Sequence, residues 1–318
     1  MSYGYRKSAD VNVRLKTSVH QIIMYGILLS IFLLFSCSQP DYSHVETRDL
    51  SGGFDQPIDM TGSLESFSFL VLNDIHFGRE DKGVYWKFDE FWQWLDTYPG
   101  SIDFALNLGD FTEDSQEDEY LEYADFIQDL ANRSIPMHTV AGNHDIRNRG
   151  RSYFSTYVCA APYKRFAHKG ISFYIIDTGN RSLGNRQLEE LIKETAQDTN
   201  LKMFCSHVPL YGSPDLIYFA LPDTQERMML LKTMVDEKVG IYFSGHHHSG
   251  DVLYKYTEEN SEFIFGAFHG RDSFFESTLP RWYVCTYDSI KNSLGITRHT
   301  VQKDGSITEV LIANLIMP

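Results

Sequence analysis

The sequence has 318 residues, of which 42% are hydrophobic and 22% charged, with 22 glycines and 10 prolines. This apolar content can build one large domain or two small ones, and it excludes a collagen-like or disordered chain. With 43 acidic and 28 basic residues the formal net charge is −15, which excludes a general nucleic-acid platform because phosphate backbones need basic groups. Composition alone does not separate a solvated acidic surface from a metal site built on Asp, Glu and the 12 histidines.

The first 36 residues have the features of an export signal. Residues 22–35 (IIMYGILLSIFLLF) carry no charge and follow a basic segment. Fourteen residues are fewer than the roughly 20 that span a bilayer, but they match the core of a signal peptide. The small residue Ser36 before Cys37 resembles the lipobox of bacterial lipoproteins. This resemblance implies cleavage before Cys37, lipidation of its sulfur, and a domain held at a membrane of the cell envelope, facing the periplasm or the cell surface. A plain secretory signal or a short anchor is the alternative.

The chain after the signal divides into a tether and a domain. Residues 37–62 are polar and contain several prolines and glycines, which is typical of a flexible tether. We expect the folded domain to span residues 63–318. Its three cysteines, Cys159, Cys205 and Cys285, are too few for a disulfide framework and allow one pair at most.

Within the domain, apolar runs alternate with segments of helical periodicity. We expect strands at 67–72, 102–108, 135–140, 173–176, 201–205 and 239–243, and helices at 85–95, 118–131, about 185–197 and 224–237. This alternation favours an α/β fold with buried sheet strands. Five later strands, at 252–256, 263–268, 282–287, 294–300 and 306–312, have few helical gaps and indicate a mixed sheet or a second sheet packed on the first. The aromatic residues of 85–95 follow helical spacing, which predicts core packing rather than a ligand platform.

Polar side chains follow five of these strands. In chain order they are Asp74 and His76, Asp110, Asn143 and His144, His207, and the run from His246 to His248. Ligands of open α/β sheets bind beyond the carboxyl ends of the strands, so we expect these side chains to converge on one site. Imidazole nitrogens, carboxylates and amide oxygens are all metal ligands.

The spacing and number of these groups point to two metal ions. Period-two alternation directs Asp74 and His76 to one side of the chain, and likewise His246 and His248, while His247 points away. Seven donors exceed the needs of one four-coordinate ion and fit two ions that share a ligand. Because no cysteine stands among them, Mn, Fe, Zn or Ni is expected.

The order of these motifs resembles the calcineurin-like metallophosphoesterases. The family pattern is Asp-x-His, Gly-Asp, Gly-Asn-His-(Asp/Glu), a single His and Gly-His-x-His, and all of it stands here within residues 74–248. The resemblance implies a four-layer sandwich of two mixed β-sheets flanked by helices, and metal-dependent hydrolysis of a small phosphate ester. It also implies a ligand set, with one ion held by Asp74, His76 and His248, the other by Asn143, His207 and His246, and Asp110 bridging both.

The expected mechanism is attack on phosphorus by a metal-bridging hydroxide. The resemblance implies that His144 contacts the phosphate and assists the leaving group, for which it needs a partner that sets its tautomer. Glu113 stands where relatives carry an acidic residue in this role; an ordinary loop carboxylate is the alternative, and Asp114 and Asp145 are competitors. Purple acid phosphatases carry Tyr at the position of Glu113, so a ferric-tyrosinate centre is disfavoured.

The sequence does not identify the substrate, and it does not decide between a phosphomonoester and a phosphodiester. Two other functions also stay open. One is a non-catalytic surface lipoprotein that uses the same fold to bind a partner or metal, and the other is a His-rich protein that captures metal.

Overall fold

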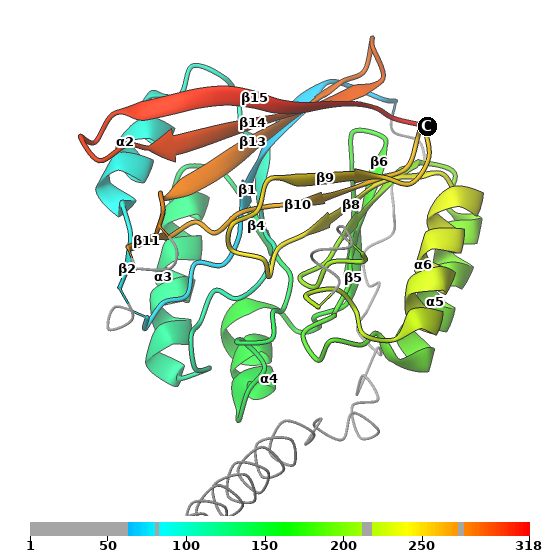
Figure 1. Ribbon diagram of the computed structural model, residues 1–318, viewed down its shortest axis with the longest axis horizontal. Coiled ribbons are helices and arrows are strands. Elements are labelled where there is room, and N and C mark those ends of the chain that lie inside the picture. Colours follow the sequence, from blue (N-terminus) through cyan, green and yellow to red (C-terminus); the bar gives the residue numbers. More distant parts are fainter. Residues whose placement is uncertain (1–62, 80–82, 212–217, 273–276) are drawn as a thin grey trace, which may run out of the picture. The chain divides into compact units, whose positions relative to one another are not determined.

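The computed structural model describes residues 63–79, 83–211, 218–272 and 277–318 (Figure 1). The expected signal segment 1–36, the lipidation site Cys37 and the tether 37–62 lie outside the described residues. Among the helices that are described, none is both long and apolar enough to cross a membrane.

The first sheet has six strands in the order β15-β14-β13-β1-β3-β4. Strands β1, β3 and β4 are parallel, whereas β13, β14 and β15 form an antiparallel meander that joins β1 through β13. The strands span Phe67–Leu72 (β1), Phe104–Asn107 (β3), Met137–Thr139 (β4), Arg281–Asp288 (β13), Ser293–Val301 (β14) and Ile307–Ile316 (β15).

The second sheet also has six strands, in the order β5-β6-β7-β8-β10-β9. Strands β6, β7, β8 and β10 are parallel, and the two edge strands β5 and β9 are antiparallel to their neighbours. The strands span Lys164–His168 (β5), Ile171–Ile175 (β6), Leu201–Cys205 (β7), Val239–Ser244 (β8), Val252–Lys255 (β9) and Ser261–Ile264 (β10).

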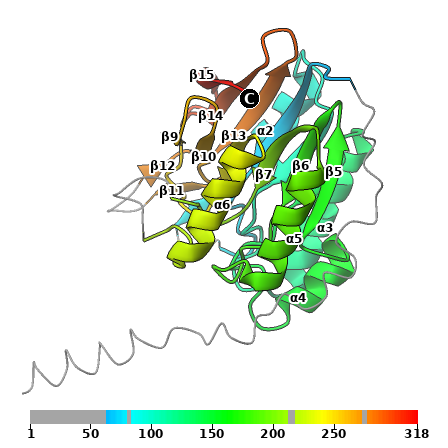
Figure 2. The same ribbon diagram turned by 90° about the vertical axis from the view of Figure 1, so that its right-hand side faces the viewer.

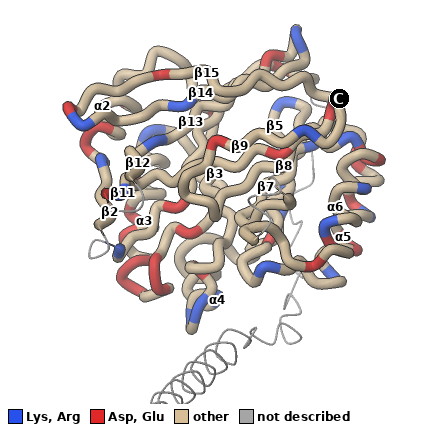
Figure 3. The backbone as a smooth tube through the Cα atoms, viewed as in Figure 1, with Lys and Arg blue, Asp and Glu red and all other residues tan. Residues whose placement is uncertain are grey.

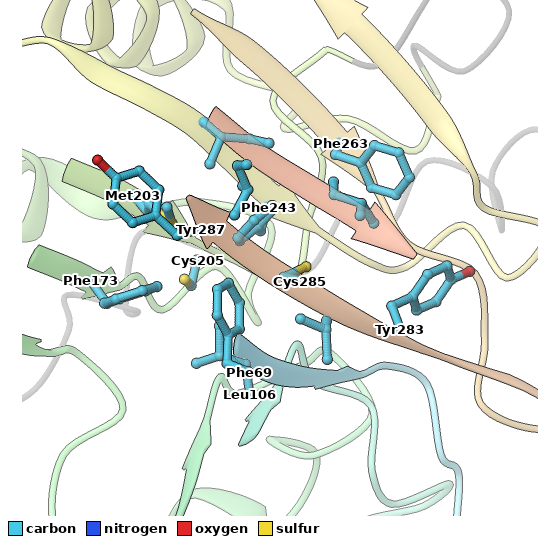
Figure 4. Close-up of a cluster of buried hydrophobic side chains, with 14 of the residues drawn as sticks. Phe69, Leu106, Phe173, Met203, Cys205, Phe243, Phe263, Tyr283, Cys285 and Tyr287 are labelled. Atoms are coloured by element: carbon cyan, nitrogen blue, oxygen red, sulfur yellow. The ribbon is translucent and has the colours of Figure 1, made fainter. Parts of the chain in front are cut away.

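Alternating side chains of the central strands fill separate hydrophobic layers. In β1, Phe69 and Val71 face the core between the two sheets, and Leu70 and Leu72 face the outer core of the first sheet. The central strands are therefore apolar on both faces, which explains their continuous hydrophobic runs. Figure 4 shows side chains of both sheets meeting in the inner core, with Phe69 of β1 opposite Phe173 of β6.

The helices cover the two outer faces. The helices on the side of the first sheet are α2 (Phe88–Thr97) and α3 (Glu117–Asn132), and those on the second are α5 (Gly184–Gln197) and α6 (Thr224–Asp236). Figure 2 shows α5 and α6 side by side in front of the second sheet. The predicted four-layer sandwich of mixed sheets and flanking helices is confirmed.

The segment 85–95 corrects one prediction. Val84–Tyr85 is a short strand, β2, and the helix begins only at Phe88. Tyr85 pairs with Gly270 in a small third sheet formed with β11 (Gly270–Asp272) and β12 (Ser277–Thr278). A pairing partner this far along the chain overrides the helical periodicity of the aromatic residues. Their predicted core packing is confirmed, since Phe91 is fully buried and the tryptophans of α2 pack around the same core.

Short elements and the cysteines complete the fold. The sequence pattern did not indicate α4 (Gly150–Tyr153), the π-helical turn Phe154–Val158 that follows it, or β5. All three cysteines of the described residues are free, and Cys205 and Cys285 are buried in the inner core. The core therefore forms without a disulfide.

Candidate active site

The predicted polar residues lie in loops at the carboxyl ends of β1, β3 and β4 of the first sheet and β7 and β8 of the second. Backbone hydrogen bonds hold the first two loops together, from Asp74 N to Gly109 O (3.1 Å) and from His76 N to Asp110 O (3.0 Å). Asp74, His76, Asp110 and His246 all have φ between 48° and 66°. Left-handed backbone costs a non-glycine residue roughly 1–3 kcal/mol and is typical of functional sites. Gly109 permits a close approach, because a Cβ there would stand 2.8 Å from His207 Nδ1.

A first group of donors forms where β1 and β8 end. His76 Nε2 lies 3.2 Å from His248 Nε2, and Asp74 Oδ1 lies 3.9 Å from each of these nitrogens. The side chains of Asp74 and His76 have no exposed surface. Two loops from different sheets thus present one carboxylate and two imidazoles to a common point.

A second group forms beside the first, around His207 Nε2. This nitrogen lies 3.1 Å from Asn143 Oδ1, 3.2 Å from His246 Nδ1 and 3.1 Å from Asp110 Oδ2. The same Oδ2 atom lies 3.9 Å from His76 Nε2 in the first group. Asp110 therefore contributes one oxygen that reaches both groups.

The geometry and chemistry of these donors fit two metal ions. Donor–metal bonds of His and Asp are about 2.0–2.2 Å long, so two donors of one ion lie at most roughly 4.4 Å apart. Every separation given above satisfies this limit. Asp74 Oδ1 is buried and makes no hydrogen bond to the rest of the described chain. A buried carboxylate oxygen is costly without a compensating partner, and a cation would supply one.

Electrostatics at His76 and His246 point the same way, whereas the raised pKa values of Asp74 and His207 favour protonated forms, whose protons a bound cation would have to displace. Burial lowers the pKa of His76 to about 4 and that of His246 to about 3, so both imidazoles are neutral and able to bind a cation. Burial raises the pKa of Asp74 well above its usual value, and the neighbouring Asp110 carboxylate adds to this. Burial would lower the pKa of His207, but its contact with Asp110 raises it to about 9. Burial would also raise the pKa of Asp110, yet His207 holds it well below its usual value.

His144 lies beside both groups but faces other partners. Its backbone N–H donates to Asp110 Oδ1 (2.7 Å), its Nδ1 lies 2.6 Å from the carbonyl oxygen of Glu113, and Arg147 Nη2 lies 2.9 Å from its Nε2. The Glu113 carbonyl accepts only from a protonated nitrogen, so the ring carries its proton on Nδ1 and its Nε2 accepts from Arg147.

Glu113 meets His144 in a different way from the one expected. Its carboxylate oxygen Oε2 lies 3.6 Å from His144 Nδ1 but only 2.9 Å from His76 Nδ1. The carboxylate therefore orients His76, leaving His76 Nε2 free to face the first group, in the arrangement typical of metal-binding histidines. The main chain of Glu113, rather than its side chain, sets the tautomer of His144.

The two competitors of Glu113, Asp145 and Asp114, have other partners. Asp145 is fully buried and accepts backbone N–H bonds from Asp110 (2.8 Å), Gly142 (2.7 Å) and Thr112 (2.9 Å), so it joins the loops after β3 and β4. The side chain of Asp114 is 58% exposed, and its Oδ1 lies 3.4 Å from Arg147 Nη1 rather than against the ring of His144. The ring of His247 packs 4.9 Å from Phe219 and belongs to neither donor group.

Two further residues at the site escaped the sequence patterns: Arg147 contacts His144, and Arg79 Nε lies 3.5 Å from Glu113 Oε2. His269, which the sequence places near the pocket because it follows the expected strand 263–268, is fully buried against the first group. A helical or strand period carries no signal for such residues. For Arg147, the sequence offered one indication of a place at the site, which is that Arg147 follows His144 by three positions in the same loop.

Comparison with known proteins agrees with this geometry. The family of calcineurin-like phosphoesterases matches residues 67–250, so the chain belongs to that family. It is a metal-dependent phosphoesterase, and the family uses two divalent metal ions. No curated protein matches the sequence.

Solved structures share the fold at low identity. A dimetal phosphatase from Danio rerio is 12% identical with a TM-score of 0.56, covering 78% of this chain and 99% of its own. GAP50, the anchor in the inner membrane complex of Plasmodium, is 16% identical with a TM-score of 0.54, covering 80% and 89%. Purple acid phosphatase PPD1 from yellow lupin seeds is 14% identical with a TM-score of 0.50, covering 78% and 53%.

Proposed function

We propose that the protein hydrolyses a small phosphate ester with two metal ions. One ion is held by Asp74, His76 and His248, and the other by Asn143, His207 and His246. Asp110 is the shared ligand. The observation that carries this assignment is the position of Asp110 Oδ2, 3.9 Å from His76 Nε2 and 3.1 Å from His207 Nε2. When bound, the two ions supply an activated water as the nucleophile and neutralise the charge on the phosphoryl oxygens.

His144 is proposed to act on the leaving group. Its Nδ1 is held by the Glu113 carbonyl, so its Nε2 is directed outward to Arg147. The side chains of His144 and Arg147 are 18% and 42% exposed, so a substrate can reach both. A leaving oxygen that takes the place of Arg147 at Nε2 would receive a proton there from the imidazolium form of His144, which carries a proton on both ring nitrogens, and would lie beside the guanidinium. Both stabilise the negative charge that develops on this oxygen.

The cellular location is a proposal from the sequence. Residues 1–36 form the signal, Cys37 carries the lipid, residues 37–62 form the tether and residues 63–318 the enzyme domain. The uncharged run 22–35 followed by Ser36-Cys37 supports this order. Cys37→Ser is expected to move the protein from the membrane fraction to the soluble fraction. A variant that stays with membranes would refute lipid anchoring.

The test of function is a substrate panel of phosphomonoesters, phosphodiesters and pyrophosphates with the purified, metal-loaded protein. We expect turnover that a chelator abolishes and that Mn²⁺ or a similar ion restores. His144→Ala is expected to lower kcat by about 10²–10⁴-fold, with metal content unchanged. His248→Ala or Asn143→Ala with full activity would sink the ligand assignment. Tight binding of two ions without turnover on the whole panel would favour the non-catalytic alternative.

A further inference from the structure

We propose that His269 is an additional metal ligand, bound to the same ion as Asp74, His76 and His248. This inference rests on the ligand set of the proposed function. We call the donors around each ion a half-site: the first half-site is the group of Asp74, His76 and His248, and the second is the group around His207. With His269 the two half-sites are chemically unequal, because three imidazoles surround the first ion and two surround the second. The expected ligand is a divalent transition-metal ion that favours nitrogen donors.

His269 stands at the right place for this role. Its ring centroid lies 5.1 Å from that of His248 and 5.7 Å from that of His76. One ring nitrogen from each of these three histidines lies within 4.8 Å of the other two. Because donors of one ion lie at most roughly 4.4 Å apart, a shift of the donor atoms by a few tenths of an ångström suffices for shared coordination.

The hydrogen bonding of His269 leaves one nitrogen without a partner. Nδ1 lies 3.2 Å from the carbonyl oxygen of Gly270, which accepts only from a protonated nitrogen. Nε2 then carries a lone pair, and this buried atom makes no hydrogen bond within the described residues. Leaving a buried acceptor unsatisfied costs free energy, which a bound cation would offset. A histidine with one nitrogen on a backbone carbonyl and the other free is the usual form of a metal ligand.

The surrounding backbone holds this ring in position. Phe268 N donates to the carbonyl oxygen of Asn73 (2.7 Å), and Asn73 directly precedes Asp74. The carbonyl oxygen of Phe268 accepts from Arg281 N (3.2 Å). On the other side, Gly270 pairs with Tyr85 in the small third sheet. His269 is thus fixed between β1, β13 and β2, on rigid structure rather than on a free loop, as a preorganised ligand requires.

The extra imidazole predicts a difference in metal preference. The first half-site offers nitrogen from His76, His248 and His269, whereas the second has only His207 and His246 beside the oxygens of Asn143 and Asp110. Imidazole-rich sites favour ions such as Zn, Fe, Co and Ni over Mg and Ca. We therefore expect the first half-site to retain its transition metal more tightly than the second.

The experiment is titration of the metal-depleted, full-length protein with Co²⁺, followed by calorimetry and by visible absorption of the bound ion. The variant is His269→Gln, and the matched control is His299→Gln. His299 is equally buried, its Nε2 also lacks a partner in the described part of the chain, and it lies 4.6 Å from the ring of Trp94 in the outer core. The wild type and the control are expected to bind two ions with the same affinities and spectra.

For His269→Gln we expect one of the two ions to bind at least about 10-fold more weakly, since even an outer partner of a metal ligand is typically worth 10–100-fold. The Co²⁺ spectrum should change for that ion and stay constant for the other. Unchanged affinities and spectra would overturn the proposal. So would a change confined to KM for a phosphoester, because His269 would then contact the substrate instead.

Two measurements keep these outcomes separate from failed folding and from a failed ligand set. Circular dichroism of the metal-depleted variant reports folding, and if His269→Gln does not fold, His269→Ala with added imidazole takes its place. Restored affinity with imidazole supports the proposal, and absent restoration in a folded variant contradicts it. A wild-type protein that binds fewer than two ions would instead refute the proposed function itself.

Discussion

Buried positions in the loops after β1, β3 and β7 include Asp74, His76, Asp110 and His207, whereas buried positions in β13 and β14 are mostly apolar, with Trp, Tyr, Val, Cys, Leu and Ile. The backbone differs as well. Asp74, His76, Asp110 and His246 adopt left-handed φ values, while β13 pairs with β14 over eight consecutive residue pairs without a shift in register. The charged side chains and strained backbone of the loops cost folding free energy. The apolar burial of the strands offsets this cost.

The acidic residues divide in a similar way, between the exposed surface and the buried site. Figure 3 shows Asp and Glu spread over helices and loops around the whole molecule, mixed with Lys and Arg. Only Asp74 and Asp110 supply acidic oxygens to the two donor groups. Most of the negative charge is therefore a solvated surface, and a few buried carboxylates carry the chemistry. Substitutions in the two regions should separate activity from stability.

The largest effect is expected from Asp110→Ala, because this carboxylate is shared by both donor groups. Metal ions contribute several kcal/mol to transition-state stabilisation, so activity should fall by more than about 1,000-fold, with both ions lost from the purified protein. Metal analysis and the phosphoesterase assay measure this, with Asp304→Ala in an exposed turn as control. Loss of only one ion would show that Asp110 is not shared.

Leu294→Ala tests the opposite region. Leu294 on β14 is fully buried in the core between the sheets. Its truncation should lower the free energy of unfolding by about 2–5 kcal/mol, as large-to-small core changes do. Urea unfolding measures the loss, and kcat per folded molecule should match the wild type at low temperature. A parallel fall in kcat would break the separation between the two regions.

Glu113→Gln should have a smaller effect, confined to one ion. The carboxylate lies 2.9 Å from His76 Nδ1, and such outer partners are typically worth 10–100-fold in metal affinity. We expect weaker binding at the half-site of His76, unchanged binding at that of His207, and an unchanged tautomer of His144, because its Nδ1 is held by the backbone. Asp114→Asn is the neighbouring control. Equal weakening of both ions would contradict the assignment of Glu113 to His76.

The smallest effect concerns the pH dependence of stability. His138 on β4 stacks on Phe166 with ring centroids 3.6 Å apart, and burial, helped by Lys164 and His168, lowers its pKa to about 3. The unfolded chain takes up this proton near pH 6.5, so between these values the unfolded state binds more protons and stability falls as pH is lowered. In His138→Phe the melting temperature should fall less steeply below pH 6.5 than in the wild type. An identical slope would show that His138 does not contribute.

The local sequence pattern predicted an element correctly where the burial of its residues depends on that segment alone. The bounds of β1 and β7 agree with the expected strands, since buried parallel strands are continuous apolar runs. The predicted start of α2 was wrong, because Tyr85 pairs with Gly270, a residue far along the chain, and is therefore part of a sheet. The π-helical turn after α4 had no signal in the spacing of apolar residues.

The sequence by itself determined which side chains stand at strand ends, and their types already indicated a metal centre. The order of the motifs, through its resemblance to the calcineurin-like metallophosphoesterases, implied phosphoester hydrolysis. The resemblance also implied how these side chains divide into two groups that share Asp110. Only the tertiary structure decided which oxygen of Asp110 reaches both groups, and that the Glu113 carboxylate turns to His76 while its carbonyl holds His144. It alone brought His269 to the first group. The physical reason is that periodicity records which way a side chain points within its own element, whereas contacts between loops of different sheets depend on how those sheets pack.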